Sequence, residues 1–295
     1  MRLPDLIVLG DVMLDVTVSS GVLARGGDVH GEVRVDPGGS AANVAVWAAE
    51  AGVAVQLHGC VGDDAAGGIV RAALQRRRVD AHLVVAAGAR TGAMLIVTEA
   101  GERSMVAHRG ANSRFTDVML PDALDTRAVF VSGYTLFDVN TEAVARAALA
   151  RARAPVVAID AGSWPLIERR GASWFFDATR QATLLFANER EAEALTGMRD
   201  EAAAHSLASR YPMAAVKLGA RGALCAAGGT VVHAPAPEIR EVDATGAGDA
   251  FDGVFLAALA RGASPPQALA RACEAGARCA AQPGRWPCPT SEPGR

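Results

Sequence analysis

The sequence predicts an α/β protein in which helices flank a mostly parallel central sheet, with a small antiparallel sheet attached to it. From about residue 127, β-prone runs alternate with helical ones, a pattern typical of βαβ units and a parallel sheet. Segments 13–18 and 30–36 instead alternate polar and apolar residues, which is typical of a sheet with one wet face. Hydrophobic residues make up 51% of the 295 residues and charged residues 21%, so a packed core is expected.

In the first half of the chain, glycine and helix-capping residues mark the ends of the expected strands and helices. Apolar runs predict strands at 6–9, 53–62 and 81–85, and a small-residue helix begins after residue 39 and ends at Gly52. A second helix over 65–78 is expected to be capped by Asp63 or Asp64. Two β-prone runs within 91–110 flank EAGE (99–102), which indicates a hairpin.

The second half continues the alternation and then ends in helices. Strands are expected at 128–133, 155–160, 182–188 and 214–219, with helices between them. A hairpin turning at Gly228 and Gly229 precedes helices at 247–261 and 264–281, and the Pro/Gly-rich segment 283–295 is expected to be frayed. Since no linker or repeat is visible, we expect one domain over 1–295, with the small sheet built from about 12–36 and 91–109.

Composition excludes several classes of function. A net charge of −3 and a pI near 6.1 argue against nucleic-acid binding, and no apolar run is long enough to span a membrane. The five Cys and six His lack the spacing of zinc ligands, which together with the start of the chain favours a cytoplasmic protein. Arg76–Arg78 is interpreted as a solvated helix end rather than a binding patch. Lys217 is the only lysine and lies in AVKLG, so the chain has no Gly-Lys-Ser/Thr phosphate loop.

The stretch VDATGAGDAF (242–251) places small residues and an acid where a long apolar helix begins. Unpaired amides at a helix start attract anions, and glycine lets phosphate oxygens approach the backbone. Asp249 would repel a phosphate, so we consider two roles for it: a general base that takes a proton from an attacking hydroxyl, or an ordinary helix cap. A dinucleotide-binding fold is disfavoured because Phe251 stands where its third glycine would be.

A second glycine pair and an early acid suggest where a second reactant binds. PGGSAAN (37–43) puts Gly38 and Gly39 before a helix, and the amide of Asn43, one turn in, suits sugar hydroxyls. Asp11 and Asp15 follow the first strand, at the strand end where open α/β sheets bind ligands. Asp15 is either a hydroxyl acceptor or a solvated loop acid.

These motifs together resemble the ribokinase-like carbohydrate kinase family of the phosphofructokinase B type. The resemblance covers nearly the whole chain and rests on six blocks in order: GDVMLD (10–15), GGSAAN (38–43), GCVGDDAAG (59–67) with GAN (110–112), ANEREAEALTG (187–197), KLGARG (217–222) and DATGAGDAF (243–251). It implies a three-layer ribokinase-like fold in which the small sheet is a lid over the acceptor. It also implies an ATP- and Mg²⁺-dependent kinase.

The resemblance also implies roles for individual residues. Asp249 would be the catalytic base, with Gly246, Ala247 and Gly248 forming the anion hole. Asp15, Gly38, Gly39 and Asn43 would bind the sugar, and Asn188, Lys217, Gly219 and Gly222 would border the nucleotide. Glu191, with Asn188, would arrange Mg²⁺ through water, and Asp243 and Thr245 match positions that hold a monovalent cation such as K⁺ in many members.

Each assignment has a plainer alternative. Asn188 and Glu191 also have the spacing of a helix-capping pair, and Lys217 also fits a strand-end cation. Asp63 and Asp64 fit a cap better than a site, and Arg109 fits a surface charge better than a contact with an anionic substrate. Tyr134 and Trp164 are expected to be packing residues.

The acceptor stays open between a small sugar, which we favour, and a nucleoside such as adenosine or pseudouridine. The segments of the small sheet contain no Phe, Trp or Tyr to stack on a base, which favours a plain sugar. Met13 and Ser40-Ala41 depart from the pattern of ribose kinases, so ribose itself is not predicted. A binding protein without turnover is the remaining alternative. The small sheet would either pair with that of a second copy, giving a homodimer, or fold onto its own chain.

Overall fold

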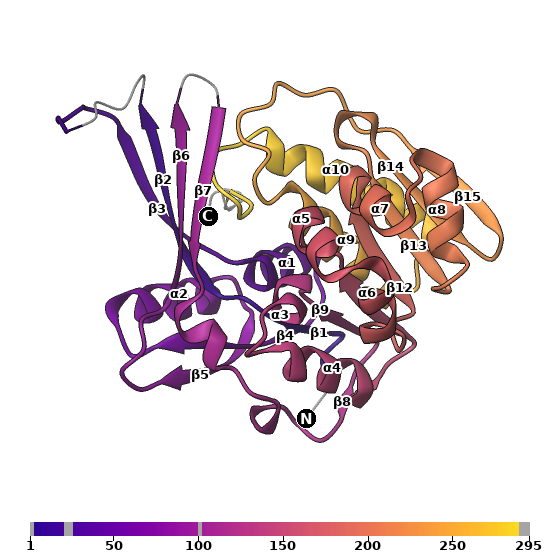
Figure 1. Cartoon of the computed structure of the whole chain (residues 1–295), viewed down its shortest axis with the longest axis horizontal. Coiled ribbons are helices and arrows are strands. Elements are labelled where there is room, and N and C mark those ends of the chain that lie inside the picture. The colour runs from indigo at the N-terminus through magenta and orange to yellow at the C-terminus, as the bar shows by residue number, and fades with distance from the viewer. Residues whose placement is uncertain (1–2, 21–25, 100–101, 289–295) are drawn as a thin grey trace, which may run out of the picture.

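The computed structural model describes residues 3–20, 26–99 and 102–288. Its largest element is a nine-stranded sheet (Figure 1). In spatial order the strands are β15 (Thr230–Ala234), β14 (Ala223–Ala227), β13 (Met213–Lys217), β12 (Leu184–Asn188), β11 (Val156–Asp160), β9 (Ala128–Val131), β1 (Leu6–Leu9), β4 (Val55–Gly62) and β5 (Asp80–Ala86). All neighbouring pairs are parallel except those that β14 makes with β13 and β15. The predicted mostly parallel sheet is confirmed.

Helices cover both faces of this sheet, which gives the predicted three layers. On one face, strand residues such as Val8 and Phe130 share a core with helices α1 (Ser40–Glu50), α2 (Ala65–Arg76), α9 (Ala247–Ala260) and α10 (Pro265–Ala280). On the other, Leu9 and Val131 pack in a core with α3 (Gly133–Phe137), α4 (Glu142–Arg151), α5 (Trp164–Arg170), α6 (Ala172–Ala178), α7 (Glu189–Thr196) and α8 (Asp200–Ala208). Neighbouring residues of one strand enter opposite cores because side chains alternate across a sheet.

A separate four-stranded sheet stands beside the main one (Figure 1). Its order is β3 (Glu32–Gly38), β2 (Met13–Ser20), β6 (Gly92–Glu99) and β7 (Glu102–His108), and we call it the small sheet. The outer pairs are antiparallel, as predicted, whereas the central pair β2–β6 runs parallel because a long connection separates the two strands. The turn of the expected hairpin at 99–102 falls partly outside the described residues.

Most predicted element boundaries agree with the structure to within two residues. The hairpin at Gly228 and Gly229 joins β14 to β15, and α9 and α10 match the two expected helices. A two-stranded pair, β8 (Leu124–Asp125) with β10 (Ala152–Arg153), was not predicted because it is too short to show a pattern. The expectation of a frayed end is wrong for 283–288, where Arg285 and Pro287 are buried, and residues 289–295 lie outside the described part.

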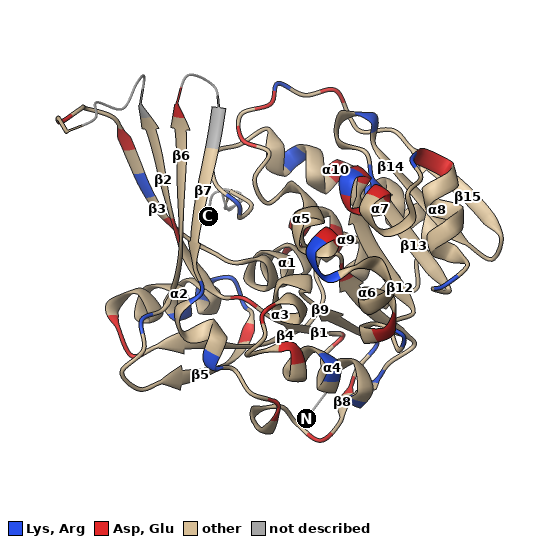
Figure 2. Ribbon diagram, viewed as in Figure 1, with Lys and Arg blue, Asp and Glu red and all other residues tan. Residues whose placement is uncertain are grey.

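Charged residues of both signs are interspersed along the ribbon rather than gathered by sign (Figure 2). In the part of the chain that the structure describes, no helix combines the length and the apolar character needed to cross a membrane.

Candidate active site

The candidate site forms where the parallel strands of the central sheet end. From β1 the chain builds β4 and β5 on one side and, from β9 onward, the remaining strands on the other, so the strand order reverses between β1 and β9. Ligands bind at such reversals, outside the carboxyl ends of the strands. Asp160, Asn188 and Lys217 are the last residues of β11, β12 and β13, so three polar side chains are delivered side by side.

Lys217 forms a buried ion cluster at this edge. Its Nζ lies 2.9 Å from Oδ2 of Asp160 and 3.0 Å from Oδ1 of Asp252. Burial by itself would lower the pKa of Lys217, but the two carboxylates outweigh burial and raise it, so the lysine is charged at neutral pH. Lys217 is therefore more than the strand-end cation of the plainer alternative: it neutralises two acids beneath the start of α9.

Asp249 is the third residue of α9 and is half-buried. Its carboxylate accepts a hydrogen bond from Ser40 Oγ at 2.9 Å on Oδ1 and one from Asn43 Nδ2 at 2.8 Å on Oδ2. Burial raises the pKa of Asp249 to about 6, although both hydrogen bonds lower it. The N-cap of α9 is Gly246 and no side chain caps it, so the capping role considered for Asp249 is not what the structure shows.

The start of α9 presents backbone amides, as the GAGD stretch predicts. Gly246 has φ 85°, a left-handed conformation that favours glycine, and from it the chain enters the helix. Gly248 and Asp249 follow as second and third helical residues, whose amides have no acceptor within the helix. The amide of Ala247 donates to the carbonyl of Ala244 at 3.2 Å, so of the expected anion-hole donors this one is already engaged.

Asp15 lies in β2 of the small sheet. It is buried, so the alternative of a solvated loop acid is wrong. Burial raises the pKa of Asp15 to about 6, Arg285 lowers it, and Asp249, Asp36 and Asp243 raise it further. The effect of Asp249 on the pKa of Asp15 indicates that the negative charge of Asp249 is felt at the Asp15 carboxylate.

Gly38 and Gly39 leave the room that this arrangement needs. A Cβ on Gly38 would lie 2.3 Å from Oδ2 of Asp15, so a side chain there would displace the carboxylate. Gly39 is the N-cap of α1 with φ 94°, and a Cβ on it would lie 2.4 Å from the carbonyl oxygen of Asp11. The glycines thus let the small sheet and α1 close around Asp15, so the role that this structure shows for them is one of packing.

The segment after α10 returns to this place, which the sequence did not predict. Trp286 Nε1 donates to Oδ1 of Asn43 at 2.8 Å. Arg285 is 1% exposed; its Nε lies 3.3 Å from Oδ2 of Asp15 and its Nη1 3.3 Å from Oδ2 of Asp243. Trp286 and Arg285, which follow α10, thus contact side chains that the resemblance assigns to the sugar (Asn43 and Asp15) and to the monovalent cation (Asp243).

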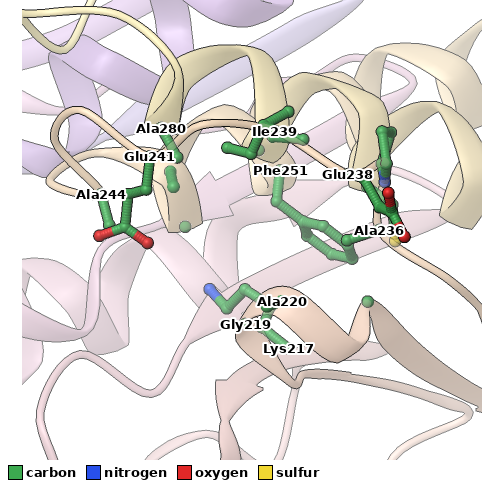
Figure 3. A pocket seen from close by; sticks show the side chains of 17 residues that line it. Lys217, Gly219, Ala220, Ala236, Glu238, Ile239, Glu241, Ala244, Phe251 and Ala280 are labelled. Carbon is green, nitrogen blue, oxygen red and sulfur yellow. The ribbon is translucent and has the colours of Figure 1, made fainter.

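A cavity of 510 Å³ adjoins the start of α9. Figure 3 shows the side chains that line it. Its walls include Lys217, Gly219, Gly222, Ala247 and Gly248, so three of the four residues expected to border a nucleotide lie here beside the backbone amides at the start of α9. Two acids, Glu238 and Glu241, also line the cavity, and its remaining walls are apolar: Ala220, Ala236, Pro237, Ile239, Ala244, Phe251, Cys273, Gly276, Ala277 and Ala280. An apolar slot that ends at backbone amides suits a flat aromatic base followed by phosphates.

Asn188 is not on the wall of that cavity, and with Glu191 it forms a capping box at the start of α7. Asn188 N and Nδ2 donate to the two carboxylate oxygens of Glu191 at 2.8 and 2.7 Å, as the plainer alternative predicts. Burial, followed by repulsion from Asp160, raises the pKa of Glu191 to about 7. Among the described residues no three His, Cys, Asp or Glu side chains cluster closely enough to hold a metal by themselves.

Arg109 and Asp64, two other polar residues considered in the sequence, stabilise the fold through their side-chain contacts. Arg109 forms a two-point ion pair with Asp11, at 2.9 and 2.7 Å, and donates from Nε to Asp138 at 2.6 Å, so it is neither a free surface charge nor a free anion receptor. Asp64 caps α2 by accepting from the amide of Gly67 at 3.0 Å, as expected.

Two aromatic residues depart from the expectation of packing. Tyr134 is 38% exposed, and its pKa is raised by burial of the hydroxyl and by Asp160, Glu191 and Asp249, so it borders the site rather than the core. Trp164 is likewise partly exposed, and the guanidinium of Arg190 lies over its ring at 5.9 Å. Tyr134 comes three residues after the end of β9. The sequence therefore carried a signal for it, because residues that follow a parallel strand at the point of reversal face the site.

Comparison with known proteins adds evidence of relationship. Residues 3–290 match the pfkB family of carbohydrate kinases. The ATP-dependent ribose-1-phosphate kinase of Halopiger xanaduensis is 32% identical over 264 residues, which is 88% of this chain and 85% of that protein. The structure resembles adenosine kinase from Sinorhizobium meliloti with TM-score 0.88 at 23% identity, covering 97% and 96% of the two chains. It also resembles a putative ribokinase II from E. coli in complex with ATP and Mg²⁺, with TM-score 0.87 at 20% identity, covering 96% and 94%.

Proposed function

We propose that this chain, which belongs to the pfkB family of carbohydrate kinases, transfers the γ-phosphoryl group of ATP to a hydroxymethyl oxygen of a small sugar, with Asp249 as the general base. Membership confirms the expected family and the expected class of enzyme, a carbohydrate kinase. The donor, the acceptor and the residue roles are the parts that we propose.

The observation that carries the proposal is the position of the Asp249 carboxylate. It lies at the start of α9, next to Gly248 on the wall of the 510 Å³ cavity. It accepts a hydrogen bond from Asn43, which is held by Trp286, and the neighbouring Arg285 pairs with Asp15. A base for phosphoryl transfer must reach the acceptor hydroxyl while the phosphates are held nearby, and Asp249 lies next to the amides at which the phosphates would be held.

The chemistry follows from that placement. Asp249 takes the proton of the acceptor hydroxyl as its oxygen forms a bond to the γ-phosphorus, the bond from phosphorus to the β,γ-bridging oxygen breaks, and ADP leaves. The amides of Gly248 and Asp249 stabilise negative charge on the transferred group, each donor contributing roughly 3–4 kcal/mol in such sites. Ser40 and Asn43 hold the carboxylate in place. The small sheet acts as a lid that keeps water from the transferred group.

ATP and Mg²⁺ are the donor and cofactor that we propose. The apolar cavity beside the amides fits an adenine base and its phosphates, and Lys217 lies at its edge. Mg²⁺ usually keeps several waters and is bound through phosphates and one or two carboxylates, so Glu191, with Asp160 near it, would hold the ion through water. Bound there, the metal ion would neutralise charge on the phosphates.

The test is steady-state release of ADP with a panel of pentoses, hexoses, sugar phosphates and nucleosides at saturating ATP and Mg²⁺. We expect turnover with a sugar that carries a free hydroxymethyl group, and none with its deoxy analogue at that carbon. Binding of acceptors and ATP without ADP release for the whole panel would support a binding protein without turnover and overturn the proposal.

A nucleoside kinase is the second candidate, because two aromatic side chains border the site. Tyr134 is partly exposed among the acids of the site, and the ring of Trp286 is half-buried beside Asn43. Aromatic faces stack on bases. Preference for adenosine or another nucleoside over every free sugar in the same assay would favour this candidate.

We also propose a homodimer through the small sheet. On its face turned away from Asp15, the cross-strand register aligns Val35 with Val16, Leu95 and Val106. Val33, Val35, Leu95 and Val106 are exposed, so the outer face is an apolar patch. Such patches mark association sites, and a second copy offers the same apolar strip with matching strand spacing.

A further inference from the structure

We propose that the guanidinium of Arg285 takes the place of the monovalent cation expected beside Asp243, so that catalysis needs no K⁺ or Na⁺. This inference rests on the proposed function for its activity measurements but not for its melting temperatures. The side chain of Arg285 is wholly removed from solvent although it carries a permanent charge.

The surroundings of Arg285 are acidic. Nη1 donates to Oδ2 of Asp243 at 3.3 Å, and Nε lies 3.3 Å from Oδ2 of Asp15. The guanidinium thus lies between two carboxylates, and the charges of Asp36 and Asp249 also act on Asp15. Carboxylates removed from water at this spacing repel one another and need a cation, and Arg285 supplies one.

The backbone is shaped to hold this side chain against the start of α9. A Cβ on Gly246 would lie 2.9 Å from Cγ of Arg285, so the glycine of the anion-binding turn makes room for the stem of the arginine. Trp47 Nε1 donates to the carbonyl oxygen of Arg285 at 2.7 Å and fixes its backbone. The guanidinium is therefore built into the turn that carries Gly248 and Asp249.

Arg285 also joins two parts of the proposed site that are far apart in sequence. Nη2 donates to Oγ1 of Thr17 at 3.4 Å, and Thr17 and Asp15 are both in β2 of the small sheet. Asp243 belongs to the loop before α9. One residue thus ties the acceptor side of the small sheet to the turn that stabilises the transferred phosphoryl group, which makes Arg285 a positioning residue.

The Nε atom of Arg285 indicates that charge attraction, and not a complete set of hydrogen bonds, holds this side chain. Nε of Arg285 is buried and has no hydrogen-bond partner, although the carboxylate of Asp15 is at ion-pair distance. A buried, charged side chain held mainly by charge serves as a counter-ion. A metal ion bound to Oδ2 of Asp243 would have to share that oxygen with the guanidinium and add a charge to it.

The first test measures the wild-type protein at constant ionic strength in chloride salts of K⁺, Na⁺ or tetramethylammonium. We expect ADP release to agree within about twofold in the three salts, and the melting temperature to be the same in K⁺ and tetramethylammonium. Activation by K⁺ of about tenfold or more, or a K⁺-specific rise in melting temperature, overturns the proposal. If no acceptor is phosphorylated, the proposed function fails, and the melting temperatures still decide this inference.

The second test removes the guanidinium of Arg285 and supplies a cation in solution instead. Arg285→Ala should lose activity in tetramethylammonium and regain at least about tenfold with K⁺ or guanidinium, while Arg285→Lys keeps most of it. Arg271→Ala, which removes an exposed arginine of α10, should behave as wild type. Full activity of Arg285→Ala in tetramethylammonium overturns the proposal, as does a loss that neither cation restores in a variant whose circular dichroism and melting curve are native. Should Arg285→Ala not fold, the wild-type measurements stand alone.

Discussion

The amide group of Asn43 donates from Nδ2 to Oδ2 of Asp249 at 2.8 Å. Since Trp286 donates to the carbonyl oxygen of the same amide, the orientation of the Asn43 side chain is set from both ends. Asn43, to which the resemblance assigns a sugar contact, therefore holds the proposed base in this structure. The proposed base, the first turn of α1 and the segment after α10 form one hydrogen-bonded unit.

Replacing Asp249 with asparagine tests the role of base most directly. Asn is nearly isosteric with Asp but cannot accept the proton, so we expect kcat to fall by roughly 10²–10⁴. ATP binding, measured by calorimetry, should stay near the wild-type value because the walls of the cavity are unchanged. The matched control is Asp122→Asn, a change of the same kind at an exposed acid in the loop before β8. Unimpaired turnover of Asp249→Asn would falsify the assignment.

The pH dependence should report the raised pKa of Asp249. A base must be ionised, so kcat/KM is expected to fall as pH drops through about 6. Asp15 has a pKa of about 6 as well, so the acid limb can be steeper than one proton. An acid limb near pH 4, the ordinary value for an aspartate, would contradict the burial argument for both groups.

Removing the hydrogen bond from Ser40 should move that limb in a defined direction. The hydroxyl donates to the ionised carboxylate of Asp249 at 2.9 Å and thereby lowers its pKa. Ser40→Ala is therefore expected to shift the acid limb of kcat/KM to higher pH, with turnover on the alkaline plateau affected less. Ser209→Ala, at an exposed site remote from α9, should leave the profile in place. A shift to lower pH would mean that Ser40 does not stabilise the charged form.

Local sequence signals predicted the parts of the site that lie within one turn of the chain. The GAGD stretch, the capping pair of Asn188 and Glu191, and the glycines before α1 all show their role through neighbours a few residues away. Backbone conformation and helix starts depend on such short spacings. These predictions therefore needed no knowledge of tertiary contacts.

Contacts between distant segments were not predictable in the same way. Asp252 lies within the apolar helix predicted at 247–261, and nothing in the sequence predicts its ion pair with Lys217, which is 35 residues away. Arg285 was placed in a tail expected to fray because Pro and Gly surround it, but Trp47 binds its carbonyl oxygen from 238 residues away. A single sequence carries no periodic signal for such partners, since they meet only when the sheet and helices are assembled.

The cluster around Lys217 should make a large contribution to stability. Lys217→Met leaves the carboxylates of Asp160 and Asp252 buried without a cation, and breaking a buried pair in this way costs roughly 3–5 kcal/mol in the free energy of unfolding. Adding Asp252→Asn should recover part of this loss, because one stranded charge is removed. Urea unfolding of both variants measures the effect. Arg221→Met, which removes an exposed cation from its acidic partners, should change stability little. A double variant less stable than Lys217→Met would contradict this account.

The outer face of the small sheet should carry the contact between two copies. Val35 is 53% and Val106 66% exposed, and both project from the face opposite Asp15. Val35→Glu and Val106→Glu each place a charge in the apolar patch. In a symmetric contact both copies carry that charge, which opposes association. Light scattering after size-exclusion chromatography is expected to show a dimer for the wild type and a monomer for these variants. Val118→Glu, at a position 83% exposed and outside the small sheet, should stay dimeric. A monomeric wild type, or dimers in both sheet variants, would show that the small sheet does not form this interface.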